Sequence, residues 1–266
     1  LFIPSKLVDL KEGWCNGTSK LNEITIAEDN KRYKYIEDKF IVCKSNEKED
    51  NYNELIFSRR DLETSKIPNN IEMICPYSFS SCKRLRNVTF DEDSKLTNIE
   101  RYSFYCSRIQ EITIPKHVKE ISEYSFSSCN ELEQIKFFED SELKTIKEHS
   151  FSSTSIKSIL IPSSVECIGD STFANCKILK SVSFPENSCL LSIGNHVYDG
   201  SGIKSIYIPS KVQELKEEWC TGTPNLIRVV ISNQNSRYSY LDDRYIVGKS
   251  DLNQDNFDLL LFCRRD

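Results

Sequence analysis

Long apolar runs are missing from this chain of 266 residues. None approaches the roughly 20 apolar residues that a membrane-spanning helix needs, so we expect no membrane insertion by this segment. Clusters of Lys and Arg are missing too, and the formal net charge is −5 with a pI near 5.5. A nucleic-acid groove needs a basic stripe, and we therefore expect no nucleic-acid partner.

Motifs for catalysis, metal binding and cofactor binding are also scarce. The eight glycines form no phosphate-binding loop, and no Cys-x-x-Cys pair occurs. Of the three histidines, His149 and His196 share one repeat position 47 residues apart. Two coils would separate them by about 10 Å, too far to share a metal, and we expect exposed turn histidines. No nucleophile or acid–base constellation appears, so we expect no enzymatic activity, no metal and no cofactor.

What the sequence does contain is a repeat. Ile-Pro recurs at a fixed interval of 47 residues, at Pro68, Pro115, Pro162 and Pro209. A second, shorter signature lies between these sites, so one period consists of two coils of 23 and 24 residues. The predicted coils are 4–26, 68–90, 91–114, 115–137, 138–161, 162–184, 185–208 and 209–231. A fixed period of this kind indicates a solenoid, which grows by stacking similar units.

Each coil closes on an alternating run rich in β-branched residues, which predicts a strand. The central inward residues would be Ile24, Val88, Ile112, Ile135, Ile159, Val182, Ile206 and Val229, and the last apolar residue of each run should also point inward. Stacked in register, these strands would make one parallel sheet. On the other side of the coil, irregular or short 3₁₀ backbone is expected beside an aromatic ladder of Phe79, Phe104, Phe126, Phe151 and Phe173.

The eleven cysteines do not read as a disulfide framework. Cys82, Cys129 and Cys176 share one coil position, 47 residues apart. Two coils would separate them by about 10 Å, whereas a disulfide needs Cα atoms within about 7 Å. Buried free thiols that pack as small hydrophobes are the better interpretation. Cys106 lies one place nearer its Phe, and its partner stays open.

Two stretches interrupt the coils, at 27–66 and 232–266. In each, two strand-like segments (FIVC with ELIF, and YIVG with LLLF) predict a β-hairpin with a polar loop. A larger period of 205 residues relates the two stretches, as Trp14 and Trp219 show. We therefore expect a single solenoid over 1–266 that carries two hairpin inserts. The sequence also begins inside a coil without Met, so a piece of a longer protein is expected.

The pattern Ile-Pro-x-x-Val-x-x-Ile-Gly-x-x-x-Phe-x-x-Cys-x-x-Leu-x-x-Val at 161–182 resembles the BspA-type leucine-rich repeat family. This resemblance covers nearly the whole chain and implies a leucine-rich-repeat solenoid of mostly β and irregular structure. The hairpin inserts also resemble those of the family, which have Asp-Gly where this chain has Asp38-Lys39 and Asp243-Arg244. A tight turn with positive φ is less comfortable without glycine. The family implies surface antigens of bacteria or protozoan parasites that adhere to host cells or extracellular matrix.

The solvent side of the predicted sheet is the candidate binding surface. Most of its outward residues are small and polar and could simply keep the sheet soluble. Exposed apolar neighbours mark contact sites, and these favour a ligand contact in coils 138–231 centred on Tyr207. The candidate ligand-binding residues are Lys136, Ser158, Leu160, Ser183, Ser205, Tyr207, Arg228 and Val230.

The sequence thus favours a non-enzymatic recognition or adhesion segment at the cell surface or outside the cell. Its partner would be a protein or a glycan of a host cell or of the extracellular matrix. The alternative is a cytoplasmic protein–protein interaction scaffold of the same fold, which the unpaired thiols favour. Neither the ligand nor the oligomeric state follows from the sequence.

Overall fold

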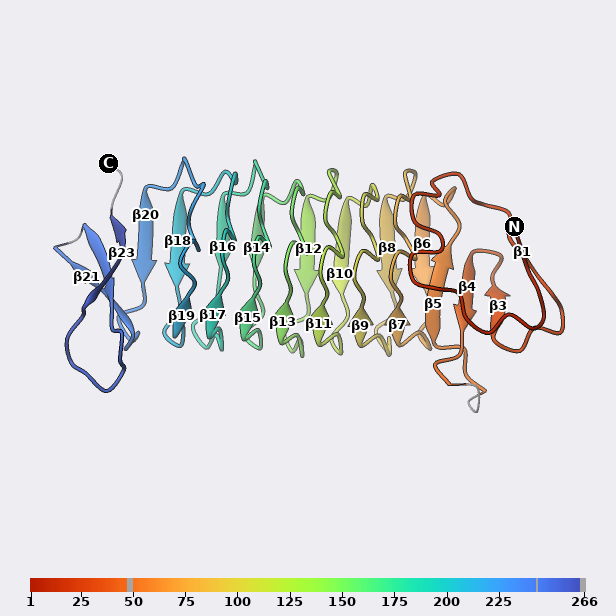
Figure 1. Cartoon of the computed structure of the whole chain (residues 1–266), viewed down its shortest axis with the longest axis horizontal. Helices are drawn as coiled ribbons and strands as arrows, with labels where there is room; N and C mark the ends of the chain where they lie inside the picture. Colours follow the sequence, from red (N-terminus) through yellow and green to blue (C-terminus); the bar gives the residue numbers. More distant parts are fainter. Residues whose placement is uncertain (47–49, 243, 264–266) are drawn as a thin grey trace.

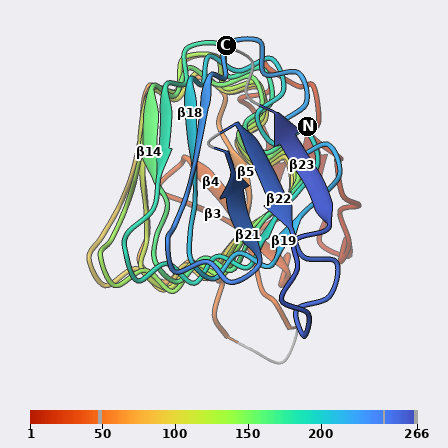
Figure 2. The same ribbon diagram turned by 90° about the vertical axis from the view of Figure 1, so that its left-hand side faces the viewer.

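The computed structural model describes residues 1–46, 50–242 and 244–263. The coils stack into an elongated β-solenoid of about ten turns (Figure 1), and viewed along its long axis they lie over one another (Figure 2). The described residues form strands and turns only, without a helix. It follows that this part of the chain contains no helix that could cross a bilayer.

Seven of the predicted strands form one side of the solenoid, called here the long-strand face, together with β6 (Thr64–Ile67), which the prediction had left inside the 27–66 insert. The strands are β6, β8 (Asn87–Phe90), β10 (Glu111–Ile114), β12 (Gln134–Phe137), β14 (Ser158–Leu160), β16 (Ser181–Ser183), β18 (Ser205–Ile208) and β20 (Arg228–Ile231). All are parallel and in register, for example Ile159 beside Val182. The central inward residues of these strands are buried as predicted, while their neighbours point outward.

The last residue of each run follows a finer rule than the one predicted. Where the run closes on Ile-Pro, as at Ile114, Ile161 and Ile208, the isoleucine is fully buried. In the coils between, Phe90 and Phe184 are only half-buried. The following proline does not explain the difference, because Pro185 comes directly after Phe184. Runs that close on Ile-Pro bury the isoleucine, whereas runs that close on phenylalanine leave the ring half-buried.

The prediction of a single parallel sheet was wrong. Opposite the long-strand face lies a second parallel ladder, the short-strand face, where irregular or 3₁₀ backbone was expected. Its strands are β7 (Met73–Ile74), β9 (Asn98–Ile99), β11 (Glu120–Ile121), β13 (Thr145–Ile146), β15 (Cys167–Ile168), β17 (Ser192–Ile193) and β19 (Glu214–Leu215). The long-strand ladder is itself divided into β6–β8–β10–β12, β14–β16 and β18–β20.

A turn with two left-handed residues follows most of these short strands. Tyr77 and Ser81 have φ values of 62° and 60° and flank the buried Phe79. Left-handed backbone costs a non-glycine residue roughly 1–2 kcal/mol. Backbone hydrogen bonds between coils offset this cost, since the N–H of Phe79 donates to Ser103 O at 2.7 Å. The turns therefore stack on one another, and hydrogen bonds between coils hold them as they hold the strands.

The predicted phenylalanine ladder is confirmed. Phe79, Phe104, Phe126, Phe151 and Phe173 are fully buried and stacked, with neighbouring ring centroids 4.8–5.8 Å apart. Tyr198 continues the stack at 6.1 Å, and Phe40 meets Phe79 edge-on at the other end. One aromatic column thus runs through the main hydrophobic core.

The predicted buried thiols occupy a second column. Cys82, Cys129 and Cys176 are buried, and none of the eleven cysteines, all of which are described, forms a disulfide. Hydroxyls fill the alternate coils: Ser107 contacts the Cys129 sulfur at 3.3 Å, and Thr154 contacts that of Cys176 at 3.2 Å. Because Ser107 holds the column position, Cys106 is left outside it and is only half-buried.

Each hairpin insert contains three antiparallel strands, one more than the two predicted. They are β3 (Tyr33–Ile36), β4 (Phe40–Cys43) and β5 (Glu54–Ser58) in the first, and β21 (Tyr238–Leu241), β22 (Tyr245–Gly248) and β23 (Leu259–Cys263) in the second. Glu37 and Asp38 adopt φ values of 52° and 51° at the β3–β4 turn, so it forms without glycine. Asp243 lies outside the described residues.

The first insert divides two hydrophobic cores. Phe40, Val42 and Leu55 face the main core, while Ile41 and Phe57 face a smaller core at the N-terminus. This explains why β4 is buried at all four positions. Strands β1 (Phe2–Ile3) and β2 (Thr25–Ile26) pair only with each other there. The run around Ile24 was therefore wrongly placed in the common sheet, although its side chain is buried.

Candidate functional site

All eight predicted ligand-binding residues lie on the outward side of the long-strand face. Lys136 is on β12, Ser158 and Leu160 on β14, Ser183 on β16, Ser205 and Tyr207 on β18, and Arg228 and Val230 on β20. The side chains point outward because each alternates with a buried neighbour, as in the exposed–buried–exposed pattern of β14. The residues span five neighbouring strands and do not form one compact cluster.

The apolar residues among them fall into two places. Tyr207 and Val230 are register partners on β18 and β20 and are both half-buried. Leu160 is 61% exposed and pairs with Ser183, which separates it from Tyr207 by one strand. Strands lie about 4.8 Å apart, so a ligand must span about 10 Å to touch both. This apolar patch is a shallow surface that suits a flat, partly apolar partner.

The structure also reveals a groove that sequence reasoning missed. Strands β8 and β10 pair at Asn87 and Val88 only, although β8 continues to Phe90. Beyond that point the strands part and leave a cavity of about 280 Å³. Lys136 is the one predicted site residue in its lining. We call this cavity the β8–β10 groove.

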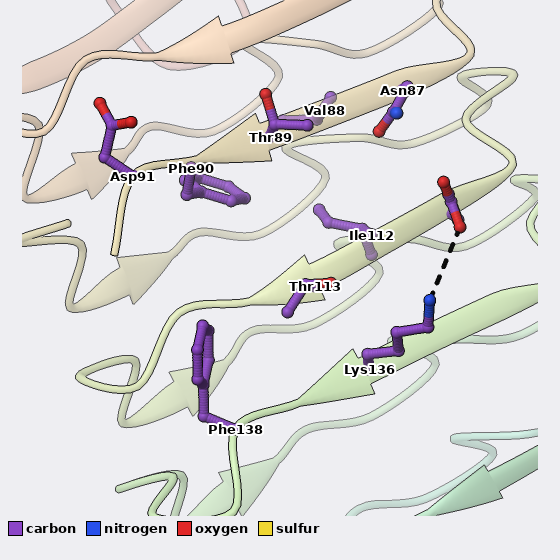
Figure 3. Close-up of a pocket in the computed structure, with 10 residues that line it drawn as sticks. Asn87, Val88, Thr89, Phe90, Asp91, Ile112, Thr113, Lys136 and Phe138 are labelled. Carbon is purple, nitrogen blue, oxygen red and sulfur yellow. Dashed lines mark ion pairs between the residues drawn. The ribbon is translucent and has the colours of Figure 1, made fainter. Parts of the chain in front are cut away.

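The walls of the β8–β10 groove combine aromatic and charged groups. Figure 3 shows Phe90 and Phe138 at the ends of β8 and β12, on either side of Thr113. The Lys136 ammonium lies 3.9 Å from the Glu111 carboxylate. Both groups are more than half exposed, so the pair contributes little to stability and is open to a ligand.

A second, shallower hollow of about 610 Å³ adjoins this groove at the other ends of the strands. It shares Asn87 and Glu111 with the β8–β10 groove. Amide and charged side chains line the rest: Arg86, Gln110, Glu133, Gln134, Lys157 and Ser158. Hydrogen-bonding groups therefore lie at one end of a continuous depression and phenyl rings at the other. This combination suits a peptide or a sugar, which have both polar edges and apolar faces.

The signal that could have revealed the groove lies in the residues that close its runs. The runs that end at Phe90 and Phe137 continue into Asp91 and Phe138, whereas their neighbours end on Ile-Pro. Where phenylalanine closes the run in place of Ile-Pro, aromatic side chains remain at the edge of the sheet. Sequence reasoning placed Phe90 inward and left Phe138 without a role.

The buried thiols do not have the properties of nucleophiles. Burial raises the pKa of the Cys129 thiol to about 12, and it raises that of Cys176 as well. A reactive cysteine needs a lowered pKa and access to solvent. Metal chemistry finds no support either, since the described residues contain no group of three or more His, Cys, Asp or Glu side chains that could hold an ion.

The histidines occupy turns as predicted, but only His117 is exposed, while His149 and His196 are half-buried. His149 stacks on Tyr124 with ring centroids 4.5 Å apart, and it continues a column formed by Tyr77, Tyr102 and Tyr124. His196 lies 2.6 Å from a Glu218 carboxylate oxygen. The rings of this column contact each other face to face, so a ligand cannot stack on the faces between them.

These features define a class of protein. A stack of coils with a closed interior and a long exposed sheet face is a scaffold that presents a binding surface. Leucine-rich-repeat proteins of this class are typically non-enzymatic and mediate protein interactions.

Sequence comparison identifies the family. The profile described as "BspA type Leucine rich repeat region" matches six copies in residues 51–177 and 144–242. The chain therefore belongs to the BspA-type leucine-rich repeat family. No curated protein matches its sequence significantly.

Solved structures share the fold. A leucine-rich repeat protein from Eubacterium ventriosum has a TM-score of 0.72 and 20% identity over 91% of this chain and 62% of its own. The pneumococcal vaccine antigen PcpA has a TM-score of 0.57 and 18% identity over 82% of this chain and 54% of its own. The Treponema pallidum protein TpLRR has a TM-score of 0.51 and 18% identity over 77% and 80%. This chain thus spans less than two thirds of the first two structures.

Proposed function

We propose that this chain is a non-enzymatic recognition segment of a larger cell-surface protein. It binds a host-cell or extracellular-matrix protein, or a glycan, through the long-strand face. The observation that carries the proposal is that the β8–β10 groove and the outward row that ends at Tyr207 and Val230 lie on one face and share Lys136. The likeness to PcpA, a vaccine antigen, supports a surface location.

Binding to a panel of purified extracellular-matrix proteins and to a glycan array tests this function. We expect Tyr207→Ala to weaken binding to the recognised component by about tenfold or more, because exposed aromatic anchors dominate such contacts. Biolayer interferometry measures the change in affinity. Phe138→Ala, measured in parallel, reports whether the β8–β10 groove shares the contact.

Leu191→Ala is the matched control, since Leu191 is an exposed apolar residue just before β17 on the short-strand face. It should leave the affinity unchanged. The proposal fails if Tyr207→Ala and Phe138→Ala both bind as the unmodified chain does, or if no component of either panel binds.

The second candidate function is an intracellular interaction scaffold of the same fold. The eleven cysteines without a disulfide favour it, because thiols persist in reducing compartments. Titration of thiols in the denatured, unreduced protein from its native source separates the two. Eleven free thiols favour the intracellular scaffold, and several disulfides favour the cell surface.

A further inference from the structure

The two hairpin inserts are the same unit, docked in the same way on the coil that precedes each. The Tyr33 hydroxyl accepts a hydrogen bond from the N–H of Leu10 at 2.9 Å. The Tyr238 hydroxyl, 205 residues later, accepts one from the N–H of Leu215, also at 2.9 Å. Both inserts also have a bulge at the same place between the middle and third strands, where Ile56 and Leu261 are the extra residues. The face that each sheet turns toward its preceding coil is buried.

The opposite face of the first insert shows what this surface accepts. Phe40, Val42 and Leu55 are fully buried there, beneath the coil that begins with β6. Strand β7 adds to the edge of β5 in parallel, with Ile74 beside Leu55. The N–H of Cys75 donates to Leu55 O at 2.9 Å, and Phe79 meets Phe40 edge-on at 6.2 Å between ring centroids.

The opposite face of the second insert has a similar composition, but no coil covers it within the described part of the chain, and only Val247, at 9% exposed, is nearly buried there. Leu260 occupies the place of Leu55 and is 67% exposed, whereas Leu55 is 0% exposed. Leu241, in the place of Ile36, is 52% exposed. Leu259, in the place of Glu54, points to the other face of β23, because successive strand residues alternate. Large exposed apolar side chains such as Leu241 and Leu260 on one sheet face mark a contact surface.

We propose that this face of β21–β23 is a docking site for another BspA-type repeat coil of the kind formed by residues 64–90. The coil adds a two-residue strand in parallel to β23, opposite Leu259 and Leu260. It places an aliphatic side chain over Leu260, as Ile74 covers Leu55, and a phenyl ring against Tyr245. The insert then connects two coils through its two apolar faces, and each face packs against a different type of coil.

The structure favours this occupant over a second copy of the chain docking head to tail. The first coil of the chain, 4–26, is the counterpart of 209–231, which packs against the face that carries Tyr238. A second copy would therefore present the coil that fits the face already covered. The coil type that fits the exposed face lies inside the chain, where β5 already covers it.

The test is a longer chain in which a second copy of residues 62–137 follows Asp266 directly. Hydrogen exchange measured by mass spectrometry reports on the amides of β23. If the added coil docks, these amides should exchange at least about tenfold more slowly than in the original chain, because protection follows burial and strand pairing. The original chain should sediment as a monomer.

The control carries Ile74→Asp in the added copy only, which places a charge over Leu260. It should exchange as the original chain does. Equal exchange of β23 in the extended and original chains would overturn the proposal, as would equal protection in the extended chain and its control. Self-association of the original chain that Leu260→Asp abolishes would also overturn it, because the occupant would then be a second copy.

Discussion

Ile159→Asp is expected to abolish folding of the solenoid. Ile159 is 3% exposed in the middle of β14 and packs in the main core beside Val182. Truncating such a residue costs about 2–5 kcal/mol, and an unpaired buried carboxylate adds a further penalty. The sum matches the whole stability of many domains, about 5–15 kcal/mol. Circular dichroism should show a loss of β structure, with no cooperative thermal transition.

The neighbouring residue supplies the control. Leu160 points outward and is 61% exposed, so Leu160→Asp should change the free energy of unfolding by no more than about 0.5 kcal/mol. The two variants carry the same new side chain one position apart. Equal stability of the two would contradict the alternation of β14 and, with it, the assignment of the exposed face.

Phe126→Ala is expected to destabilise the chain by about 3–5 kcal/mol. Phe126 is fully buried and stacks on Phe104 at 5.0 Å and on Phe151 at 5.5 Å. Its removal leaves a cavity in the aromatic column and deprives two rings of a partner. It also weakens the turn in which Tyr124 and Ser128 hold positive φ angles. Urea unfolding followed by circular dichroism measures the loss.

Phe138→Ala is the matched control, since Phe138 is 42% exposed at the edge of the sheet. We expect it to cost less than about 1 kcal/mol, because a large part of Phe138 already contacts water and its removal leaves no closed cavity. A near-neutral Phe126→Ala would show that the phenyl column does not stabilise the stack.

The long-strand face could be predicted because its signal is strong. Runs such as KSILI and KSVSF alternate over several residues, and a period of two specifies which side each residue takes. The repeat then places every run in register with the next. The same argument identified the candidate site residues on that face before any contact between them was visible.

The short-strand face could not be predicted in this way. Its strands contain two residues each, such as Glu120–Ile121, and two residues carry no detectable period. The turns after them adopt positive φ at Tyr102 and His149, where sequence reasoning expects glycine. Stacking between coils stabilises that backbone, and no single coil contains this information.

The β8–β10 groove depends on where two strands part. That point follows from the fit of Phe90 and Phe138 against their neighbours, which is a property of the assembled sheet. The burial of Phe40 and Leu55 likewise depends on tertiary contacts with the next coil. In both cases the residue types were visible in the sequence, but their neighbours were not.

Disulfide trapping between neighbouring coils tests the central claim, that the coils stack in register around one interior. Leu160→Cys combined with Ser183→Cys puts two thiols on register partners that both face outward. Adjacent strands lie about 4.8 Å apart, within the roughly 7 Å that a disulfide spans. Mild oxidation and peptide mapping should therefore recover this cross-link. Leu160→Cys with Val182→Cys should not cross-link, because Val182 points inward. The opposite result, a cross-link to position 182 and none to position 183, would contradict the stacking register and the exposed face built on it.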